Sequence, residues 1–232
     1  MPHDLATAPD DTSPSLPARR LPWGSGALFA FGGVAAGVLA KAADESGAWW
    51  PGLDWLGDLT SQQAVWVLAV ALISIMARTP LAAAVRAAIS MLAMCAGYYA
   101  FAAAVLHYPV GSDAAIWALV AVTVVPAAAA LLRLARTADR WWSAIIVAVA
   151  AAACVADDAI SRIVIALTEP TTSDFLFTLR PVRAVVDLAA AIVIVLAVPR
   201  SWRVRGIAAA AALVLGFALP PLIDEVRSAI GV

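Results

Sequence analysis

Long apolar runs dominate this sequence, and they constrain its fold more than any other feature. A run of about 20 apolar residues is enough for one helix to cross a bilayer. Seven runs approach this length, at Gly26–Ala43, Ala64–Ala77, Leu81–Leu106, Ala114–Leu134, Trp142–Leu167, Pro181–Val198 and Gly206–Ile223. The second run is short, and either tilts little or begins within the Trp-rich loop before it. The sequence therefore predicts an all-α, polytopic membrane helix bundle with about seven transmembrane helices.

Composition agrees with a membrane location. Of the 232 residues, 63% are hydrophobic and only 13% are charged, with a mean hydropathy of +0.90. Soluble domains carry roughly 25% charged residues. The formal net charge of -1 gives no overall basic field, so we expect the lipid bilayer as a partner and no nucleic acid.

The first 22 residues differ from the rest of the chain. They are rich in Pro, Asp, Ser and Thr and have no apolar period, which predicts a disordered tail at 1–22 before a transmembrane helical domain at 23–232. Ala40-Lys41-Ala42, at the end of the first apolar run, has the pattern of a secretory cleavage site. Lys41 interrupts that pattern and further spans follow, which favours a retained anchor.

The connections between the runs alternate in charge, and this alternation predicts the topology. Every second connection is basic, with Arg78 and Arg86, then Arg133, Arg136 and Arg140, then Arg200, Arg203 and Arg205. The other connections carry mainly acidic residues. Because Lys and Arg stay on the cytoplasmic side, we expect the N-terminus inside and the C-terminus outside. The location predicted is a bacterial cytoplasmic membrane.

Charge gathers at the end of the first span. The stretch Ala36–Gln63 places Lys41, Asp44 and Glu45 within about one helical turn and follows them with a cluster of tryptophans. Tryptophan is enriched at membrane–water boundaries. Lys41 and Glu45 are four residues apart, as are Asp158 and Arg162 and also Arg183 and Asp187. This spacing puts both side chains on one helix face, so we expect opposite charges to neutralise one another inside the spans.

With this topology, the ionisable side chains within the spans fall toward the outer face. They predict one polar, acid-lined cavity that is open to the outside. The candidate binding residues are Asp44, Glu45, Asp157, Asp158, Arg162, Asp187, Tyr98 and Trp49. An equally supported interpretation is a set of structural salt bridges near helix ends, where charge costs less than in the bilayer centre.

A repeat is a further hypothesis. Ala43-Asp44-Glu45-Ser46 ends the first span, and Ala156-Asp157-Asp158-Ala159 lies in the fifth. Each is followed by an outer loop, a span, a basic turn with Pro80 or Pro199, and another Ala-rich span. This order is typical of a 3+1+3 parallel repeat, as found in several transporter folds. The alternative is that Ala-rich helices resemble one another by composition.

Several familiar sites are not predicted. No Cys/His cluster has the spacing of metal ligands, and no Gly-rich loop ends in Lys-Ser or Lys-Thr for a nucleotide. Cys95 and Cys154 lie inside apolar runs and are expected to be buried thiols. The sequence thus predicts no metal and no cofactor, and a catalytic residue cannot be assigned.

The residues also resemble a known family. The segments GGVAAGVLAKAADESGAWW, WLGDL, AVWVLAVALI and AGYYAF are similar to those of an uncharacterised family of actinobacterial multi-pass membrane proteins, known as a domain of unknown function. The resemblance covers roughly residues 25 to 165. It implies a compact helical membrane domain and supplies no activity.

Three classes of function remain open from the sequence. The first is a carrier or binding subunit for a small solute or cation, in which a buried acid has the raised pKa that proton coupling needs. The second is a membrane-embedded enzyme that acts on a lipid or isoprenoid with an intramembrane carboxylate as general acid. The third is a structural or accessory subunit of a membrane complex, which allows for an oligomer or a partner subunit.

Overall fold

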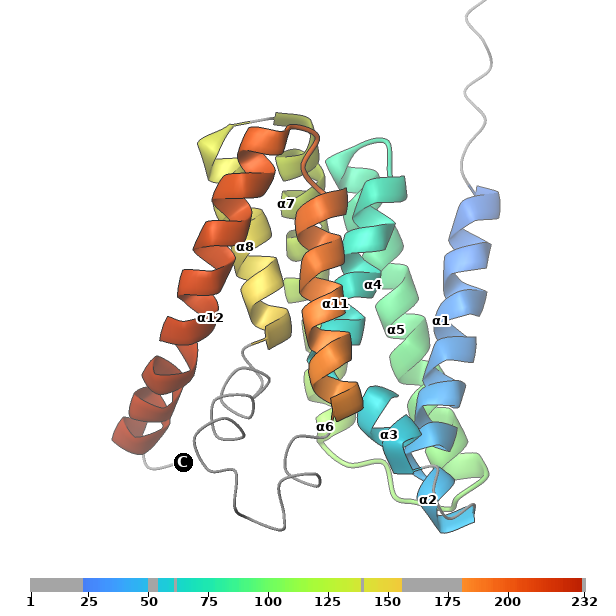
Figure 1. Ribbon diagram of the computed structural model, residues 1–232. Coiled ribbons are helices and arrows are strands. Elements are labelled where there is room, and N and C mark those ends of the chain that lie inside the picture. Colours follow the sequence, from blue (N-terminus) through green and yellow to red (C-terminus); the bar gives the residue numbers. More distant parts are fainter. Residues whose placement is uncertain (1–22, 50–53, 61, 139, 156–180, 231–232) are drawn as a thin grey trace, which may run out of the picture.

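The computed structural model describes residues 23–49, 54–60, 62–138, 140–155 and 181–230, and these residues form helices joined by short turns (Figure 1). Within them there is no β-strand. The helices are α1 (Trp23–Asp44), α2 (Ser46–Trp49), α3 (Asp54–Thr60), α4 (Gln63–Met76), α5 (Pro80–Ala104), α6 (Asp113–Val122), α7 (Val124–Ala138), α8 (Trp141–Val155), α11 (Pro181–Ala197) and α12 (Trp202–Ile230). The all-α prediction is confirmed.

Three of the predicted spans are long and apolar enough to cross a membrane. They are Gly26–Asp44, Pro80–Ala104 and the combined length of α6 and α7, Asp113–Ala138. Helices α4 and α8 are apolar but shorter. At 1.5 Å per residue, the 14 residues of α4 extend for about 21 Å, less than the hydrocarbon thickness of a bilayer.

The described part of the Trp-rich connection before α4 is helical, which corrects the prediction of a loop. It contains α2 and α3, and α3 packs against the end of α1. The contact is close because Gly57 has no side chain. A Cβ at this position would lie 3.1 Å from the carbonyl oxygen of Ala43. The chain therefore folds back on α1 before α4 begins, and α4 starts at Gln63 with its backbone already inside the bundle.

The fourth span is divided at Thr123. Helix α6 ends at Val122 and α7 begins at Val124. Pro126 explains the break, because it has no N–H and its ring collides with the carbonyl of the residue four positions earlier, Val122. The Thr123 hydroxyl donates to the Leu119 carbonyl over 2.7 Å. The fourth predicted span is therefore built from two helices.

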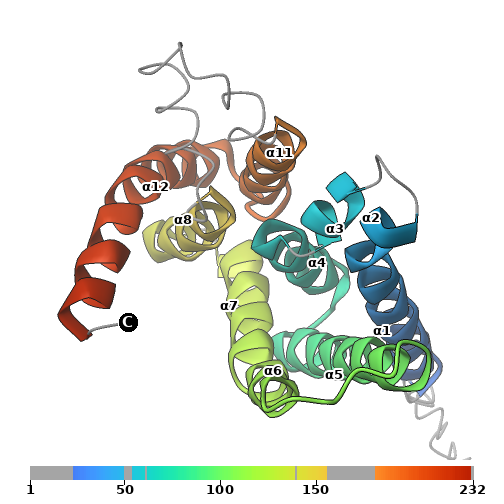
Figure 2. The same ribbon diagram turned by 90° about the horizontal axis from the view of Figure 1, so that it is seen from below.

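Helices α1 and α5 approach each other unusually closely along their length (Figure 2). Glycine makes this possible on both sides: a Cβ at Gly33 or Gly37 would collide with the backbone of α5, at the carbonyls of Ser90 and Met94. On α5, a Cβ at Gly97 would collide with the backbone of α1. Small residues allow helix backbones to pack tightly in membranes. The face of α1 that carries Gly33 and Gly37 therefore packs against α5 of the same chain.

Arginines gather at one end of the bundle, which we call the arginine end. This end holds the C-termini of α4, α7 and α11 and the N-termini of α5, α8 and α12 (Figure 1). The arginines there are Arg78, Arg86, Arg133, Arg136, Arg140, Arg200, Arg203 and Arg205. The opposite end, which we call the acidic end, holds α2, α3 and the α5–α6 turn (Figure 1).

Two arginines of α7 bind the C-termini of the neighbouring helices. Arg133 donates from Nη1 to the Ile75 carbonyl over 3.4 Å and from Nη2 to the Arg78 carbonyl over 3.1 Å, at the end of α4. Arg136 donates to the carbonyls of Ala197 and Val198 at the end of α11. The last carbonyls of a helix have no partner within it, and a cation there also favours the helix dipole.

The core lies where α4 is surrounded by α5, α7, α8 and α11 (Figure 2). Its side chains are small. Alanine dominates, and among the larger members Ile194, Val147 and Val198 are fully buried. Because alanine lacks a long side chain, the helices pack closely without interlocking large residues. The described part of the chain thus forms one bundle with a distinct polar chemistry at each end.

Substitution at two glycines of α1 should have opposite effects. Gly37→Ala places a methyl group against the α5 backbone and should lower the free energy of unfolding by about 1–3 kcal/mol through overpacking. Gly32, in the same helix, has open space where a methyl group would lie, with no atom within 4 Å. Gly32→Ala should leave stability unchanged or raise it by up to about 1 kcal/mol. Thermal unfolding of the purified variants in detergent measures both effects, and equal shifts would contradict the close α1–α5 contact.

Candidate functional site

An ion pair lies at the C-terminal end of α1. The ammonium of Lys41 lies 2.6 Å from Glu45 Oε1, and their side chains are 11% and 21% exposed. The two residues are one helical turn apart, as the sequence predicted, and this predicted pair is confirmed. Partial burial of both groups reduces solvent screening, so the pair neutralises charge that the apolar surroundings would otherwise disfavour.

Asp44 has its own partner on α5. The Tyr98 hydroxyl donates to Asp44 Oδ2 over 2.6 Å, which is short, as expected for a bond to a carboxylate. The Thr60 hydroxyl, at the end of α3, lies 3.4 Å from Asp44 Oδ1. Side chains from α1, α3 and α5 therefore converge on one carboxylate. The close α1–α5 packing at Gly37 and Gly97 brings Tyr98 within reach.

The turn after α5 adds a second tyrosine. His107 has a positive φ of 58°, and the Tyr108 N–H bonds back to the Ala102 carbonyl over 3.0 Å. This reversal brings the Tyr108 hydroxyl to 3.5 Å from Glu45 Oε2. The Lys41 ammonium lies 5.4 Å from the ring centroid of Tyr98 and 5.2 Å from that of Tyr108, within the range of cation–π attraction.

These residues form what we call the α1 cluster, consisting of Lys41, Asp44, Glu45, Thr60, Tyr98 and Tyr108. Each charged group in it has a partner in the cluster. Sequence reasoning found Asp44, Glu45 and Tyr98, and it missed Thr60 and Tyr108. The resulting arrangement holds α1, α3 and α5 together, and its carboxylates are already satisfied by protein groups.

Asp187 lies in a different part of the acidic half. It is only 2% exposed and belongs to α11, which packs against α4 and α8. Cys154 of α8 is near enough to interact with its charge. The four-residue spacing of Arg183 and Asp187 on α11 is as predicted, and both side chains have interaction partners in the structure. A carboxyl group at this depth is expensive and marks a functional position more often than a helix-end charge does.

Gln62 is a buried polar residue that sequence reasoning missed. It is 1% exposed, and neither its Oε1 nor its Nε2 has a hydrogen-bond partner. It precedes the first residue of α4 without capping it through its side chain. An unsatisfied buried amide costs about 1–3 kcal/mol. The only sequence signal was a polar Ser-Gln-Gln segment directly before an apolar run, which is also the signal of an ordinary solvated loop.

The remaining predicted residues divide between two places. Trp49 ends α2 and is 44% exposed. Asp157, Asp158 and Arg162 lie outside the described residues. Asp44, Glu45 and Tyr98 meet between α1 and α5, whereas Asp187 faces the α4–α8–α11 side, and α3 contacts both α1 and α11. The described part of the chain therefore brings the candidates into two groups, with α3 between them.

Metal binding has no support in the described residues. No three side chains of His, Cys, Asp or Glu come together there in a way that would hold an ion. Both cysteines are buried free thiols, as predicted. A pocket among the described residues lies at the arginine end, away from the α1 cluster.

The apolar helices and the separation of charge between the two ends define a helical membrane protein. Comparison with family models gives one match, described as a family of unknown function (DUF6518), over residues 17–226. The chain belongs to this family. The sequence-based resemblance to a family without an assigned activity is confirmed, and the match extends beyond the residues that carried it. No curated protein and no solved structure matches the chain.

Removal of the Tyr98 hydroxyl tests the α1 cluster. Tyr98→Phe deletes the donor to Asp44 and should destabilise the protein by about 1 kcal/mol, since hydrogen bonds between membrane helices are worth about 0.6–1.7 kcal/mol. Tyr99→Phe is the matched control, because the described residues include no hydrogen bond from the Tyr99 hydroxyl. Melting temperatures in detergent should fall for Tyr98→Phe alone. Equal melting temperatures for the two variants would argue against a structural bond at Asp44.

Proposed function

We propose that this chain crosses the bacterial cytoplasmic membrane seven times, with its N-terminus inside and its C-terminus outside. The distribution of arginine supports this topology. Eight arginines lie at the arginine end, and Asp139 is the only acid in the connections there. Retention of Lys and Arg on the cytoplasmic side then orients the bundle. Helices α4, α8, α11 and α12 complete the count of seven, with α3 extending the short α4 toward the outer surface.

Thiol labelling tests this topology. In a variant whose two cysteines are replaced by alanine, a membrane-impermeant maleimide should label Val110→Cys in intact cells. Val110 is 55% exposed in the turn between α5 and α6. Thr137→Cys, exposed near the end of α7, should be labelled only after the membrane is permeabilised. The reverse pattern would overturn the orientation, and labelling of both in intact cells would contradict a span between them.

We further propose that the protein is a carrier or binding subunit for a small cation or a cationic solute. The observation that carries this proposal is the burial of Asp187. Its carboxyl is about 9 Å along α11 from Pro181 and 2% exposed. A negative group at this depth supplies the counter-charge for a cation and, when protonated, a coupling site. The acids of the α1 cluster are less suited to this role, because Asp44 is exposed and the Glu45 side chain is 21% exposed.

Gln62 supports the same region of the bundle. Helices α4 and α11 pack against each other, so Gln62, which directly precedes α4, and Asp187 of α11 belong to neighbouring parts of the bundle. The helical structure is interrupted between α3 and α4, beside Gln62. Carriers commonly build their binding sites at such helix interruptions. The amide oxygen of Gln62 is an additional neutral acceptor for a desolvated cation. A bound solute would give the Gln62 amide the partner that the described residues do not provide.

The hypothesis of a 3+1+3 repeat is part of this proposal. Helix α1 packs on α5 and α8 packs on α12, which are the first and third spans of the two halves. Helix α7 lies between the halves and binds the C-termini of the two second spans, α4 and α11, through Arg133 and Arg136. The halves also differ: α11 packs closely on α8, whereas α4 packs on α5. The repeat is thus supported in its overall order and is irregular in its packing.

Cation exchange in reconstituted vesicles tests the function. Vesicles loaded with a pH-sensitive dye receive a gradient of Na⁺ or of K⁺, and the wild-type protein should produce a change of internal pH. Asp187→Asn should slow this change about 10-fold or more, because loss of a charged hydrogen-bonding group costs roughly 1.5–3 kcal/mol. Gln62→Leu should slow it by a smaller factor.

Asp113→Asn is the matched control, since it removes one carboxylate from an exposed position at the start of α6. Its rate should equal that of the wild type. If neither gradient produces a pH change above that of protein-free vesicles, proton-coupled exchange of these cations is wrong. If all three variants behave alike, Asp187 has no special role in exchange.

A further inference from the structure

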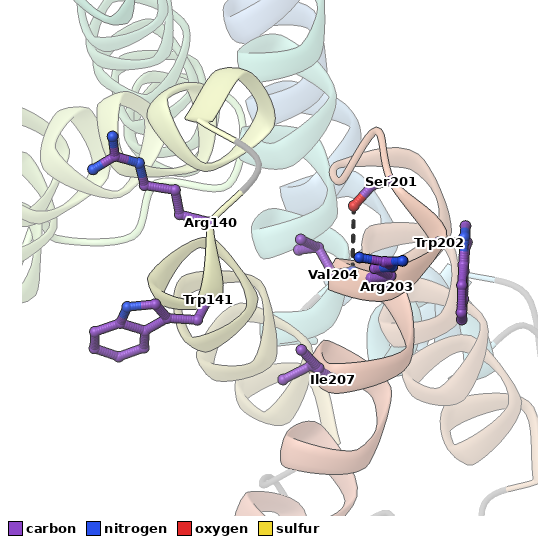
Figure 3. Close-up of a pocket in the computed structure, with 7 residues that line it drawn as sticks. All are labelled: Arg140, Trp141, Ser201, Trp202, Arg203, Val204 and Ile207. Carbon is purple, nitrogen blue, oxygen red and sulfur yellow. Dashed lines mark hydrogen bonds between the residues drawn. The ribbon is translucent and has the colours of Figure 1, made fainter.

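A pocket of about 500 Å³ lies at the arginine end, between the first turns of α8 and α12 (Figure 3). It is separate from the α1 cluster and from Asp187, which lie in the acidic half of the bundle. The residues that line it are Arg140, Trp141, Ser201, Trp202, Arg203, Val204 and Ile207. No acid is among these lining residues. The pocket therefore combines cationic, aromatic and aliphatic side chains.

The two cations of this pocket are available for a ligand. Arg140 and Arg203 are both exposed, and within the described residues neither forms an ion pair. By contrast, the neighbouring Arg205 donates from Nε and Nη2 to the Pro199 carbonyl, both over 3.2 Å, so it is committed to the fold. Arg203 lies over the Trp202 ring, with its guanidinium carbon 5.8 Å from the ring centroid. Asp139 precedes Arg140 and lies outside the described residues.

Two helices begin at this pocket and add to its positive potential. Ser201 accepts from the Val204 N–H over 3.4 Å at the start of α12, and the Ser143 hydroxyl accepts from the Arg140 N–H over 3.4 Å at the start of α8. Each hydroxyl satisfies one of the free N–H groups of a first turn. The other first-turn N–H groups and the helix dipoles favour an anion. Together with the arginines, they make this place favourable for an anion.

The apolar part of the pocket indicates which anion it suits. Trp141 is 70% exposed and Trp202 is 76% exposed, at the first residues of α8 and α12. Tryptophan is enriched where membrane helices meet lipid headgroups. Ile207 follows on α12, five residues deeper into the bundle, and is 51% exposed. A soluble anion would gain nothing from these aromatic and aliphatic surfaces. A lipid would place its phosphate at the arginines and its acyl chains along Ile207.

We propose that this pocket binds the phosphodiester headgroup of an anionic phospholipid. Arg140 from the α8 side and Arg203 from the α12 side contact the phosphate, and the two tryptophans flank the headgroup and glycerol region. In Figure 3, the side chains of Arg140 and Trp141 extend away from α12. Arg140 is exposed and makes no ion pair with a described residue. Rotation of its side chain toward the phosphate therefore breaks no such pair. Basic pockets between helices at the cytoplasmic side bind anionic lipids in this way.

Native mass spectrometry in a neutral detergent tests this site. Wild-type protein titrated with phosphatidylglycerol should give a saturable adduct of one lipid, whereas phosphatidylcholine should give much less. The double variant Arg140→Gln/Arg203→Gln should reduce the phosphatidylglycerol adduct about 10-fold or more, since each contact to a charged group is worth roughly a factor of 10. The double variant Arg78→Gln/Arg86→Gln removes two charges from the same end, outside the pocket, and should bind lipid within about twofold of the wild type.

The melting temperature without lipid controls for folding of both double variants, and the wild-type lipid preference is independent of any variant. Equal losses in the two double variants would overturn the proposal in favour of diffuse attraction to the whole arginine end. Equal adducts of the two lipids on the wild type would also overturn it. Competition of inorganic phosphate with phosphatidylglycerol at equal concentration would identify a site for a soluble anion and contradict a lipid site.

Discussion

The packing of this bundle depends on the hydrogen bonds that its short central helices, α4 and α11, receive at their last backbone carbonyls. Helices α4 and α11 both stop before a proline-containing turn, and their last carbonyls face an environment with little water. Arg133 and Arg136, three residues apart on α7, donate to these carbonyls on either side. Because the two guanidinium groups come from one helix, they also fix α4 and α11 relative to α7. The rest of the core, which is mostly alanine, has few large side chains that would otherwise fix these positions.

Charge at the two ends of the bundle serves different purposes. At the acidic end, opposite charges in the α1 cluster neutralise one another, and the cluster joins three helices. At the arginine end, no arginine pairs with an acid of the described residues, and several bind backbone carbonyls instead. The excess positive charge that remains is what orients the protein in our proposal and attracts an anionic headgroup. The buried acid on α11 belongs to neither group, and its burial is why we assign it the functional role.

Local patterns in the sequence predicted what depends on local geometry. Apolar runs located the helices, and the four-residue spacing identified the Lys41–Glu45 pair. Contacts between distant segments were not predictable in the same way. Tyr108 reaches Glu45 only because the backbone reverses at His107, and Arg133 reaches α4 only because α7 packs beside it. Gln62 was missed because burial of a polar residue next to an apolar run has no sequence signature. The α2 and α3 helices were missed because tryptophan and glycine are weak helix formers.

The Lys41–Glu45 pair has a consequence for how the chain enters the membrane. During synthesis, α1 emerges long before α5, so Tyr98 is not yet present when the end of α1 reaches the lipid. A lone ammonium or carboxylate in that helix would oppose insertion. Lys41 and Glu45 lie one turn apart on the same helix and neutralise each other without waiting for any later segment. The order of synthesis thus gives a reason for both members of this pair to reside at the end of the first span, whereas Asp44, beside them, relies on a partner that arrives afterwards.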